Sequence, residues 1–224
     1  MKIGFLLFPE VTQLDFTGPL QFLSRLPGSE TVLIAKSNDP IKTDTPMRVL
    51  PTHTFDTAPK LDLLCVPGGF GTAAAIADKE TLRFVREAGT DAEYVTSVCT
   101  GALVLGAAGL LEGKNATTHW AYTDLLELCG ATHVDARVVR DGNTFTGGGV
   151  TAGIDFALTV ASAIKGETVA QSLQLGLEYD PSPPFDMGHP SKAPEQILEA
   201  LKPRYIASRE TTAVAIKAAR NTAL

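Results

Sequence analysis

The sequence predicts a doubly wound α/β fold, in which a largely parallel sheet carries helices on both faces. Short runs of aromatic and β-branched residues alternate along the chain with helical patterns, as in proteins built from strand–helix–strand units. Residues 2–8 are almost continuously apolar, which is typical of a central strand covered on both faces. With 224 residues, of which 44% are hydrophobic, the chain is long enough to bury one large core.

No break in composition and no linker divides the sequence. We therefore predict one α/β domain over residues 1–190, followed by a C-terminal helical appendage over residues 191–224. Between them, residues 179–190 are rich in proline and are not expected to form regular structure. This stretch is expected to wrap over the domain or over a partner.

The first half of the chain is expected to place strands at residues 2–8, 31–35, 47–50 and 61–66. Pro9 ends the first of these runs. Pro19 fits the first turn of the helix that follows, because a proline there loses no intrahelical hydrogen bond, and the apolar residues after it recur at helical spacing. Asp78 is expected to cap a helix over residues 79–88.

The second half continues the same alternation. A strand is expected over residues 94–98, and a helix of small residues over 101–110. Residues 137–146 are typical of a hairpin or strand pair, with Asp-Gly-Asn at 141–143 as its turn. The other expected elements are a turn at 111–114, a short strand at 116–118, and helices at 122–128, 151–164, 167–175, 195–201 and 205–219.

Cys99 stands where a strand pattern changes into a helix pattern. The residues before it are aromatic or β-branched, and those after it are rich in Ala, Leu and Gly. A side chain at such a corner is pushed out of the packed layers, beside backbone N–H groups that lack intrahelical partners. Those N–H groups and the helix dipole favour a thiolate. We therefore predict that Cys99 is a nucleophile on an elbow; the alternative is a buried core cysteine, which is common.

Two other segments are expected at the same edge of the sheet as Cys99. Asp15 ends the first strand-to-helix connection, and the Gly-rich residues 67–71 follow a core strand. In an open α/β sheet, connections at the carboxyl ends of strands build the ligand crevice. An N-cap or first-turn acid is the alternative for Asp15. The Gly-rich turn is too short for a dinucleotide or phosphate-loop motif, and Cys65 before it is expected to be an inert core thiol.

Composition argues against several classes of protein. The formal net charge is −6 and no basic run is present, so a nucleic-acid surface is not expected. No apolar stretch has the length of a membrane-spanning helix, and the N-terminus lacks the pattern of a signal peptide. Three widely spaced cysteines and four scattered histidines predict no disulfide framework, no metal site and no cofactor. A reducing cytoplasm fits this composition best.

Three segments carry a family resemblance. S-V-C-T-G-A-L-V-L-G-A-A-G-L-L, L-L-C-V-P-G-G-F-G and T-Q-L-D-F-T-G-P resemble the ThiJ/PfpI superfamily, and they occur in the expected order. The resemblance covers residues 1 to about 190 and implies a flavodoxin-like fold of the class I glutamine amidotransferase-like type. It also implies a catalytic cysteine on the elbow, here Cys99, an acid from the first connection beside it, here Asp15, and an oxyanion hole.

Within the superfamily, these segments together with A-T-T-H-W, D-A-R-V-V-R-D and T-G-G-G-V-T-A-G-I-D-F-A-L resemble isonitrile hydratases. The resemblance implies that a small isonitrile is hydrated to an N-substituted formamide. We expect the Cys99 thiolate to attack the terminal carbon while Asp15, its pKa raised by the neighbouring sulfur, supplies a proton. The backbone N–H groups of Gly69 and Thr100 are expected to stabilise developing charge, and the Thr100 hydroxyl to orient water or the substrate nitrogen.

Two other activities stay open. A glyoxalase- or deglycase-type enzyme of the superfamily would use Cys99 and the same carboxyl group on an α-oxoaldehyde. The segments also resemble the ligand-sensing half of AraC-type regulators, although only a short tail follows here, so a non-catalytic sensor is the third possibility. A peptidase is less expected, because Thr100 stands where the protease-like members have a histidine directly after the cysteine.

The remaining polar candidates fit structural roles at least as well as catalytic ones. His119, beside a tryptophan after a short strand, is more often structural than catalytic in such a setting. Arg137 and Asp155 fit a buried ion pair or a helix cap. The other histidines, which are expected on the surface or in loops, are His53, His133 and His189. Small-residue helices and the proline-rich stretch favour a homodimer.

Overall fold

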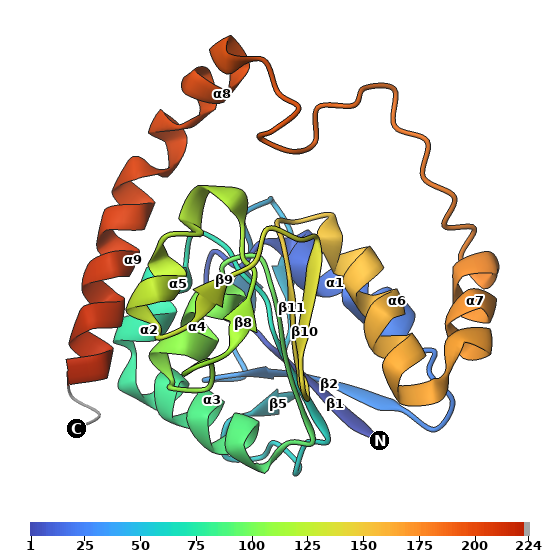
Figure 1. The fold of residues 1–224 in the computed structure, drawn as a ribbon. Coiled ribbons are helices and arrows are strands. Elements are labelled where there is room, and N and C mark those ends of the chain that lie inside the picture. Colours follow the sequence, from blue (N-terminus) through green and yellow to red (C-terminus); the bar gives the residue numbers. More distant parts are fainter. Residues whose placement is uncertain (222–224) are drawn as a thin grey trace.

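The computed structural model describes residues 1–221, and in this part of the chain the main sheet has seven strands (Figure 1). Its strands are β1 (Lys2–Leu6), β2 (Glu30–Ala35), β5 (His53–Thr54), β6 (Leu63–Val66), β7 (Tyr94–Val98), β10 (Val138–Asp141) and β11 (Thr144–Gly147). Their order is β10-β11-β7-β6-β1-β2-β5, and all neighbours run parallel except β10 and β11. The predicted α/β fold is confirmed, with one antiparallel hairpin at its edge.

Two groups of helices cover the sheet (Figure 1). On one face α1 (Gln13–Leu23), α6 (Ala152–Lys165) and α7 (Glu167–Gly176) pack in sequence against one another. The other face carries α2 (Thr72–Ala77), α3 (Lys79–Asp91), α4 (Gly101–Ala107), α5 (Leu125–Leu128) and α9 (Pro203–Asn221). Helices on both faces are what the sequence predicts.

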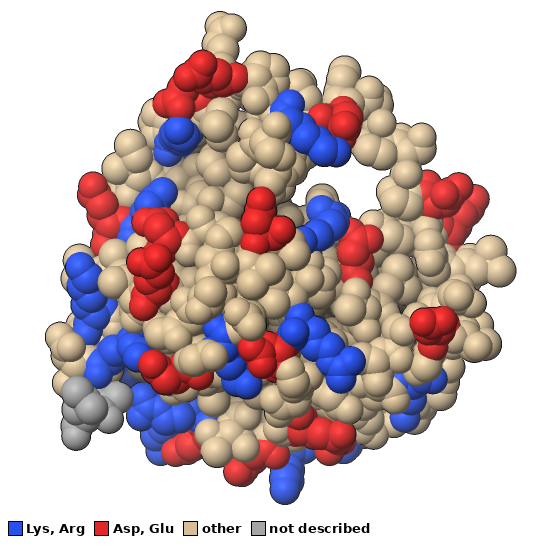
Figure 2. All heavy atoms as spheres, in the orientation of Figure 1, with Lys and Arg blue, Asp and Glu red and all other residues tan. Residues whose placement is uncertain are grey.

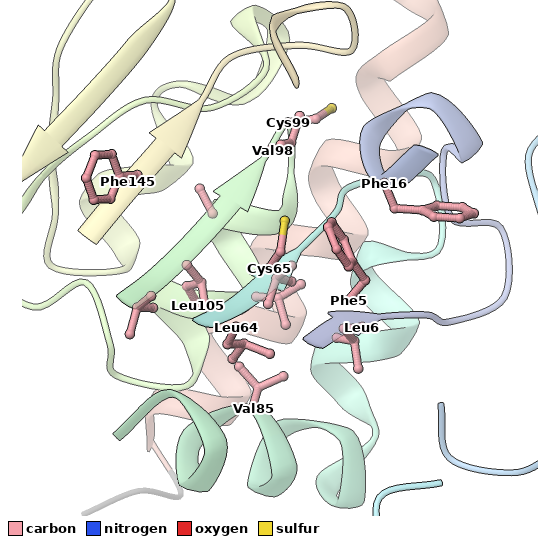
Figure 3. Close-up of a cluster of buried hydrophobic side chains, with 14 of the residues drawn as sticks. Phe5, Leu6, Phe16, Leu64, Cys65, Val85, Val98, Cys99, Leu105 and Phe145 are labelled. Atoms are coloured by element: carbon pink, nitrogen blue, oxygen red, sulfur yellow. The ribbon is translucent and has the colours of Figure 1, made fainter. Parts of the chain in front are cut away.

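The core lies between the sheet and its helices (Figure 3). Phe5 and Leu64, from the neighbouring strands β1 and β6, are completely buried. Phe16 of α1 packs from one face, and Val85 of α3 and Leu105 of α4 from the other. Burying one side chain of this size stabilises the fold by about 1.5–3 kcal/mol, so these apolar runs are held firmly in the two-sided arrangement.

The chain reverses its direction of winding beside β1. From β1 it passes to β2 on one side, and it later crosses back to β6 on the other. In doubly wound sheets the ligand crevice forms at such a switch point, outside the carboxyl ends of the strands. Residues 7–12 after β1, 67–71 after β6 and 99–100 after β7 meet there. These connections hold the residues that the sequence analysis selected.

Some local predictions are wrong. Pro19 lies in the middle of α1 rather than in its first turn, because the helix already begins at Gln13. The short strand β8 (Asn115–Ala116) stops before residues 117–118, since the Thr117 amide donates to the Thr146 hydroxyl (2.8 Å). Helix α2 was not expected.

The other short elements are β3 (Ile41–Lys42), β4 (Arg48–Val49), β9 (Thr132–His133) and the 3₁₀ helix η1 (Trp120–Tyr122). Strand β3 pairs with β4, and β8 pairs with β9, outside the main sheet.

Residues 177–194 form an arch without helix or strand that joins α7 to α8 (Glu195–Leu201) (Figure 1). The prediction of irregular structure for the proline-rich stretch is therefore confirmed. After α8, α9 returns to the body of the protein and packs against α2 and α4. The predicted boundary at residue 190 stays a prediction, and residues 222–224 of the predicted appendage lie outside the described residues.

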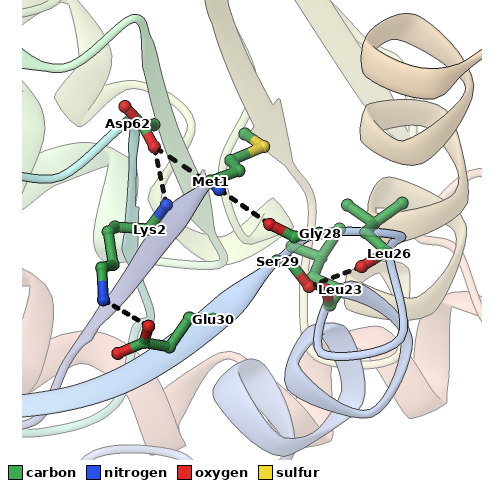
Figure 4. Close-up of polar contacts among 8 residues, drawn as sticks. All are labelled: Met1, Lys2, Leu23, Leu26, Gly28, Ser29, Glu30 and Asp62. Atoms are coloured by element: carbon green, nitrogen blue, oxygen red, sulfur yellow. Dashed lines mark hydrogen bonds and ion pairs between the residues drawn. The ribbon is translucent and has the colours of Figure 1, made fainter.

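Polar contacts tie the amino ends of the strands together (Figure 4). The Lys2 amide donates to Asp62 Oδ2 (2.6 Å), and the N-terminal amino group of Met1 donates to the Gly28 carbonyl (2.8 Å). The Lys2 ammonium pairs with Glu30. These contacts fix β1 between β2 and β6 at the end of the sheet that faces away from the crevice.

The face of the protein that Figure 2 shows is of mixed charge. On this face, basic and acidic side chains are interspersed, without a large area of one sign. Across residues 1–221 no helix combines the length and apolar character needed to span a bilayer. In the same residues no group of three or more His, Cys, Asp or Glu side chains is arranged to hold a metal ion, and all three cysteines are free thiols.

Candidate active site

Cys99 occupies a strained corner between β7 and α4. Its φ angle is 57°, in the left-handed region that residues other than glycine rarely adopt. The backbone around it is held firmly: the Cys99 amide donates to the carbonyls of Gly147 and Gly148, both at 3.0 Å, and its carbonyl accepts from the Thr118 hydroxyl at 2.8 Å. The structure therefore contains the elbow that the change of pattern predicts.

The Cys99 side chain faces a cavity. This cavity has a volume of about 180 Å³, and Cys99 and Thr100 are among the residues that line it. Figure 3 shows the Cys99 sulfur beyond the end of β7, whereas Cys65 lies inside the apolar cluster. Burial raises the pKa of the Cys65 thiol to about 12, as expected of an inert core cysteine.

Cys99 is held as a thiol and not as the expected thiolate. Burial is the largest cause, and together with the neighbouring Asp15 it raises the pKa of Cys99 well above its ordinary value. The backbone N–H groups of Thr100 and Val150 donate to the sulfur and lower this pKa, but only in part. Helix α4 is also short, which limits the contribution of its dipole. Desolvation therefore outweighs the backbone donors on which the prediction of a thiolate depended.

Asp15 lies beside Cys99, as the sequence predicts. It is in the first turn of α1 and has no exposed surface. Its Oδ2 accepts the Gly68 amide at 3.0 Å, whereas Oδ1 has no hydrogen-bond partner among residues 1–221. Burial raises the pKa of Asp15 to about 7, and its interactions with the Cys99 thiol and the Gly68 amide lower it only in part. The predicted increase in the pKa of Asp15 is confirmed, but its largest cause is desolvation and not repulsion by a thiolate.

A buried chain of hydrogen bonds joins Thr100 to the Gly-rich turn. The Gly69 amide donates to Thr100 Oγ1 at 3.0 Å, and Thr72 Oγ1 lies 2.8 Å from the same atom. The Thr72 hydroxyl in turn donates to the Gly69 carbonyl at 2.8 Å. The Gly69 amide, which we expected to be free for an oxyanion, is therefore already bonded to a side chain.

Val150 is a site residue that the sequence analysis missed. Its backbone N–H reaches the Cys99 sulfur from the connection between β11 and α6. The glycines at 147–149 come just before it, and a Cβ on Gly149 would lie 2.5 Å from the His119 ring. Such a run of glycines signals close approach of backbone to another group, and this was the available clue.

Aromatic rings form one wall of the cavity. The rings of Phe70, His119, Tyr122 and Tyr205 all line it. The centroid of the Tyr205 ring lies 5.2 Å from that of His119, 6.0 Å from that of Tyr122 and 6.4 Å from that of Phe70. Tyr205 belongs to α9, so the C-terminal helix supplies part of the wall. Arg204 and Asp44 add side chains of opposite charge to the lining.

His119 lines the cavity as a neutral imidazole. Burial lowers its pKa to about 4, so at neutral pH it carries no charge. Its Nδ1 accepts the Ala121 amide at 3.2 Å, which assigns the ring proton to Nε2. His119 therefore presents an N–H donor and has little capacity for acid–base work near pH 7.

The other polar candidates lie away from this cavity. Arg137 and Asp155 form a partly exposed ion pair, and Asp155 also accepts from the Tyr179 hydroxyl (2.9 Å). His189 lies on the arch, 3.3 Å from an oxygen of Asp135. His53 lies in the short strand β5 and His133 in the short strand β9. His133 is exposed, as expected of a surface residue, whereas His53 is only partly exposed.

A doubly wound sheet with a cysteine on a strained corner and a buried acid beside it defines a class of cysteine-containing α/β proteins. Comparison with known proteins gives the family: the model of the DJ-1/PfpI family matches residues 1–163, and the chain belongs to this family. The chain is also 55% identical over 204 residues to "Isonitrile hydratase" of Pseudomonas putida, covering 91% of this chain and 90% of that protein.

Two further proteins are similar to this chain. The crystal structure of a ThiJ/PfpI family protein from Pseudomonas syringae matches with a TM-score of 0.93 and 42% identity, over 96% of this chain and 90% of that one. The HTH-type transcriptional regulator GbdR of Pseudomonas aeruginosa is 26% identical over 187 residues. That match covers 80% of this chain but only 51% of the regulator.

Proposed function

We propose that this chain hydrates isonitriles to N-substituted formamides. The observation that carries the proposal is the buried pair of Cys99, which lines a cavity of about 180 Å³, and Asp15, which lies behind the lining beside the sulfur. The 55% identity to the isonitrile hydratase of Pseudomonas putida supports the substrate class. The aromatic wall suits the apolar substituent that an isonitrile carries on its nitrogen.

The first step adds the S–H bond of Cys99 across the terminal carbon of the isonitrile. Burial raises the pKa of Asp15 to about 7 and that of Cys99 well above its ordinary value of 9.0. When the Cys99–Asp15 pair has lost one proton, it therefore consists of the Cys99 thiol and the Asp15 carboxylate. Asp15 takes the thiol proton as the sulfur attacks and delivers it to the same carbon. A thioimidate, R–N=CH–S–Cys99, results. The N–H groups of Thr100 and Val150 stabilise the charge that develops on sulfur during this transfer.

The second step releases the product. Water adds to the thioimidate carbon and a proton goes to the nitrogen, which gives R–NH–CH(OH)–S–Cys99. When the carbon–sulfur bond breaks, the hydroxyl proton passes through Asp15 to the sulfur, so that the formamide R–NH–CHO leaves and the thiol is restored. No cofactor or metal ion takes part in this sequence.

One assay separates the proposal from its alternatives. We expect the protein to convert cyclohexyl isocyanide into the corresponding formamide, detected by mass spectrometry, and to leave methylglyoxal unchanged. Lactate from methylglyoxal without any formamide would instead indicate a glyoxalase. Tight binding of a small molecule without turnover of either compound would indicate a sensor, the alternative that the similarity to the regulator GbdR favours.

We also propose that the chain is a cytoplasmic homodimer. Leu175 at the end of α7 is 83% exposed, and Phe185 on the arch is 75% exposed. Contiguous exposed apolar surface marks sites that bind another protein, and we propose that these two side chains belong to one such surface. Three free thiols fit a reducing compartment. Light scattering should give the mass of two chains, and Leu175→Glu combined with Phe185→Ser should halve it; a wild-type protein with the mass of one chain would contradict the dimer.

A further inference from the structure

We propose that Thr72 is a positioning residue that switches the Thr100 hydroxyl between accepting and donating a hydrogen bond in the cavity. The inference rests on the proposed hydratase reaction. Thr100 lines the cavity, whereas Thr72 is not among the described residues that do so. Thr72 therefore acts on the substrate only through Thr100.

The two hydroxyl groups form a closed and dry network. Thr72 and Thr100 are 1% and 3% exposed, and their Oγ1 atoms are 2.8 Å apart. A hydroxyl group has one proton to donate and two lone pairs that accept. The Gly69 amide occupies one lone pair of Thr100, and the Gly69 carbonyl lies 2.8 Å from Thr72 Oγ1 but 3.4 Å from Thr100 Oγ1. These distances leave two ways to place the two hydroxyl protons.

In the first arrangement Thr72 donates to the Gly69 carbonyl and Thr100 donates to Thr72. The second lone pair of Thr100 is then free for a donor in the cavity. In the other arrangement Thr72 donates to Thr100, whose lone pairs are then both occupied. The Thr100 proton is now free for an acceptor in the cavity, because its contact with the Gly69 carbonyl is long.

The proposed reaction needs both arrangements in turn. Attack of sulfur on the isonitrile leaves a basic lone pair on nitrogen, which a hydroxyl donor stabilises. Addition of water to the thioimidate requires an acceptor that orients a water O–H. Rotation of the Thr72 hydroxyl changes Thr100 from donor to acceptor between these steps without moving any heavy atom.

Removing the Thr72 hydroxyl should therefore impair the two steps unequally. In Thr72→Val the Thr100 hydroxyl has no Thr72 oxygen to which it can donate while it accepts from water. Its proton then has only the long contact to the Gly69 carbonyl. Water addition should therefore slow more than sulfur attack. We expect kcat for cyclohexyl isocyanide to fall about tenfold and KM to fall with it, so that kcat/KM, which reports on sulfur attack, changes less than about twofold. Intact-protein mass spectrometry during turnover should show the thioimidate on Cys99 accumulating. Thr72→Ser keeps the hydroxyl and should restore kcat to within about threefold of the wild type.

Thr81→Val is the matched control. Thr81 is a buried threonine of α3 that donates to Asp78 Oδ2 at 3.0 Å and is not among the described residues that line the cavity. Its variant should therefore keep the wild-type kcat even if its melting temperature falls. If Thr72→Val does not fold, Thr72→Ala is measured in its place and should show the same accumulation.

The outcomes separate this inference from the proposed function. A Thr72 variant without the hydroxyl that matches the wild type in kcat and in adduct level overturns the inference and leaves the hydratase intact. A Thr72→Ser variant as slow as Thr72→Val also overturns it, since shape and not the hydroxyl would then matter. A wild-type protein that makes no formamide overturns the proposed function, and the inference with it.

Discussion

Two aspartates at opposite ends of the sheet accept the same kind of hydrogen bond, yet their surroundings differ. At the carboxyl ends Asp15 accepts the Gly68 amide at 3.0 Å, and at the amino ends Asp62 accepts the Lys2 amide at 2.6 Å. Asp15 is fully buried beside a thiol, whereas the Asp62 side chain is 48% exposed and lies 3.9 Å from the N-terminal amino group (Figure 4). Burial next to a cavity, and not the backbone bond, makes an acid that exchanges protons near neutral pH.

The largest effect is expected from removing the sulfur at the carboxyl ends. Cys99→Ala should lower formamide production by at least about a thousandfold, because the covalent route is lost. Cys65→Ala is the matched control: it removes a buried thiol from the neighbouring strand and should keep the wild-type rate at a stability cost of about 1 kcal/mol. Formamide production that survives in Cys99→Ala would exclude the thioimidate.

Substituting the two aspartates tests the comparison directly. Asp15→Asn keeps the shape of the side chain but removes the group that carries the proton between sulfur and carbon, so kcat should fall about a hundredfold or more. Asp62→Asn should leave kcat within about twofold of the wild type, since it lies at the other end of the sheet. Equal rates in these two variants would show that burial of Asp15 has no catalytic consequence.

The pH dependence sharpens the comparison further. Burial raises the pKa of Asp15 from 3.8 to about 7, so below pH 7 the pair with Cys99 holds two protons and Asp15 has no capacity to accept the thiol proton. As the pH rises through about 7, kcat/KM should therefore increase by up to about tenfold per pH unit and then level off. Asp15→Asn should lack this increase. A rate independent of pH between 5 and 9 in the wild type would contradict the assignment.

The smallest effect is expected at the aromatic wall. Tyr205→Ala removes a ring that packs against His119 and Phe70, so a small isonitrile should bind more weakly, with KM raised about threefold and kcat nearly unchanged. A bulkier aryl isonitrile should lose less, because the cavity is larger. Equal effects on small and large substrates would mean that Tyr205 does not limit the size of the substituent.

Local sequence patterns located the centre of the site but not its surroundings. Cys99 and Asp15 were found because each stands at a strand–helix connection, and the topology of the sheet brings such connections together. Tyr205 was missed because the arch brings its helix back to the cavity, and no local sequence pattern predicts the course of the arch. The expected thiolate failed for a similar reason: the helix terminus is visible in the sequence, whereas the depth of burial that raises the pKa of Cys99 is a property of the folded chain.

The arch also has a consequence for the order in which the site is completed. During synthesis the residues that form the thiol–carboxyl pair leave the ribosome long before Tyr205, which follows the arch and α8. A nascent chain can therefore assemble the sheet and its elbow while one side of the crevice still faces bulk water. Docking of α9 closes that side, so the sulfur becomes shielded from other thiols and oxidants in the cell only after this helix has been made.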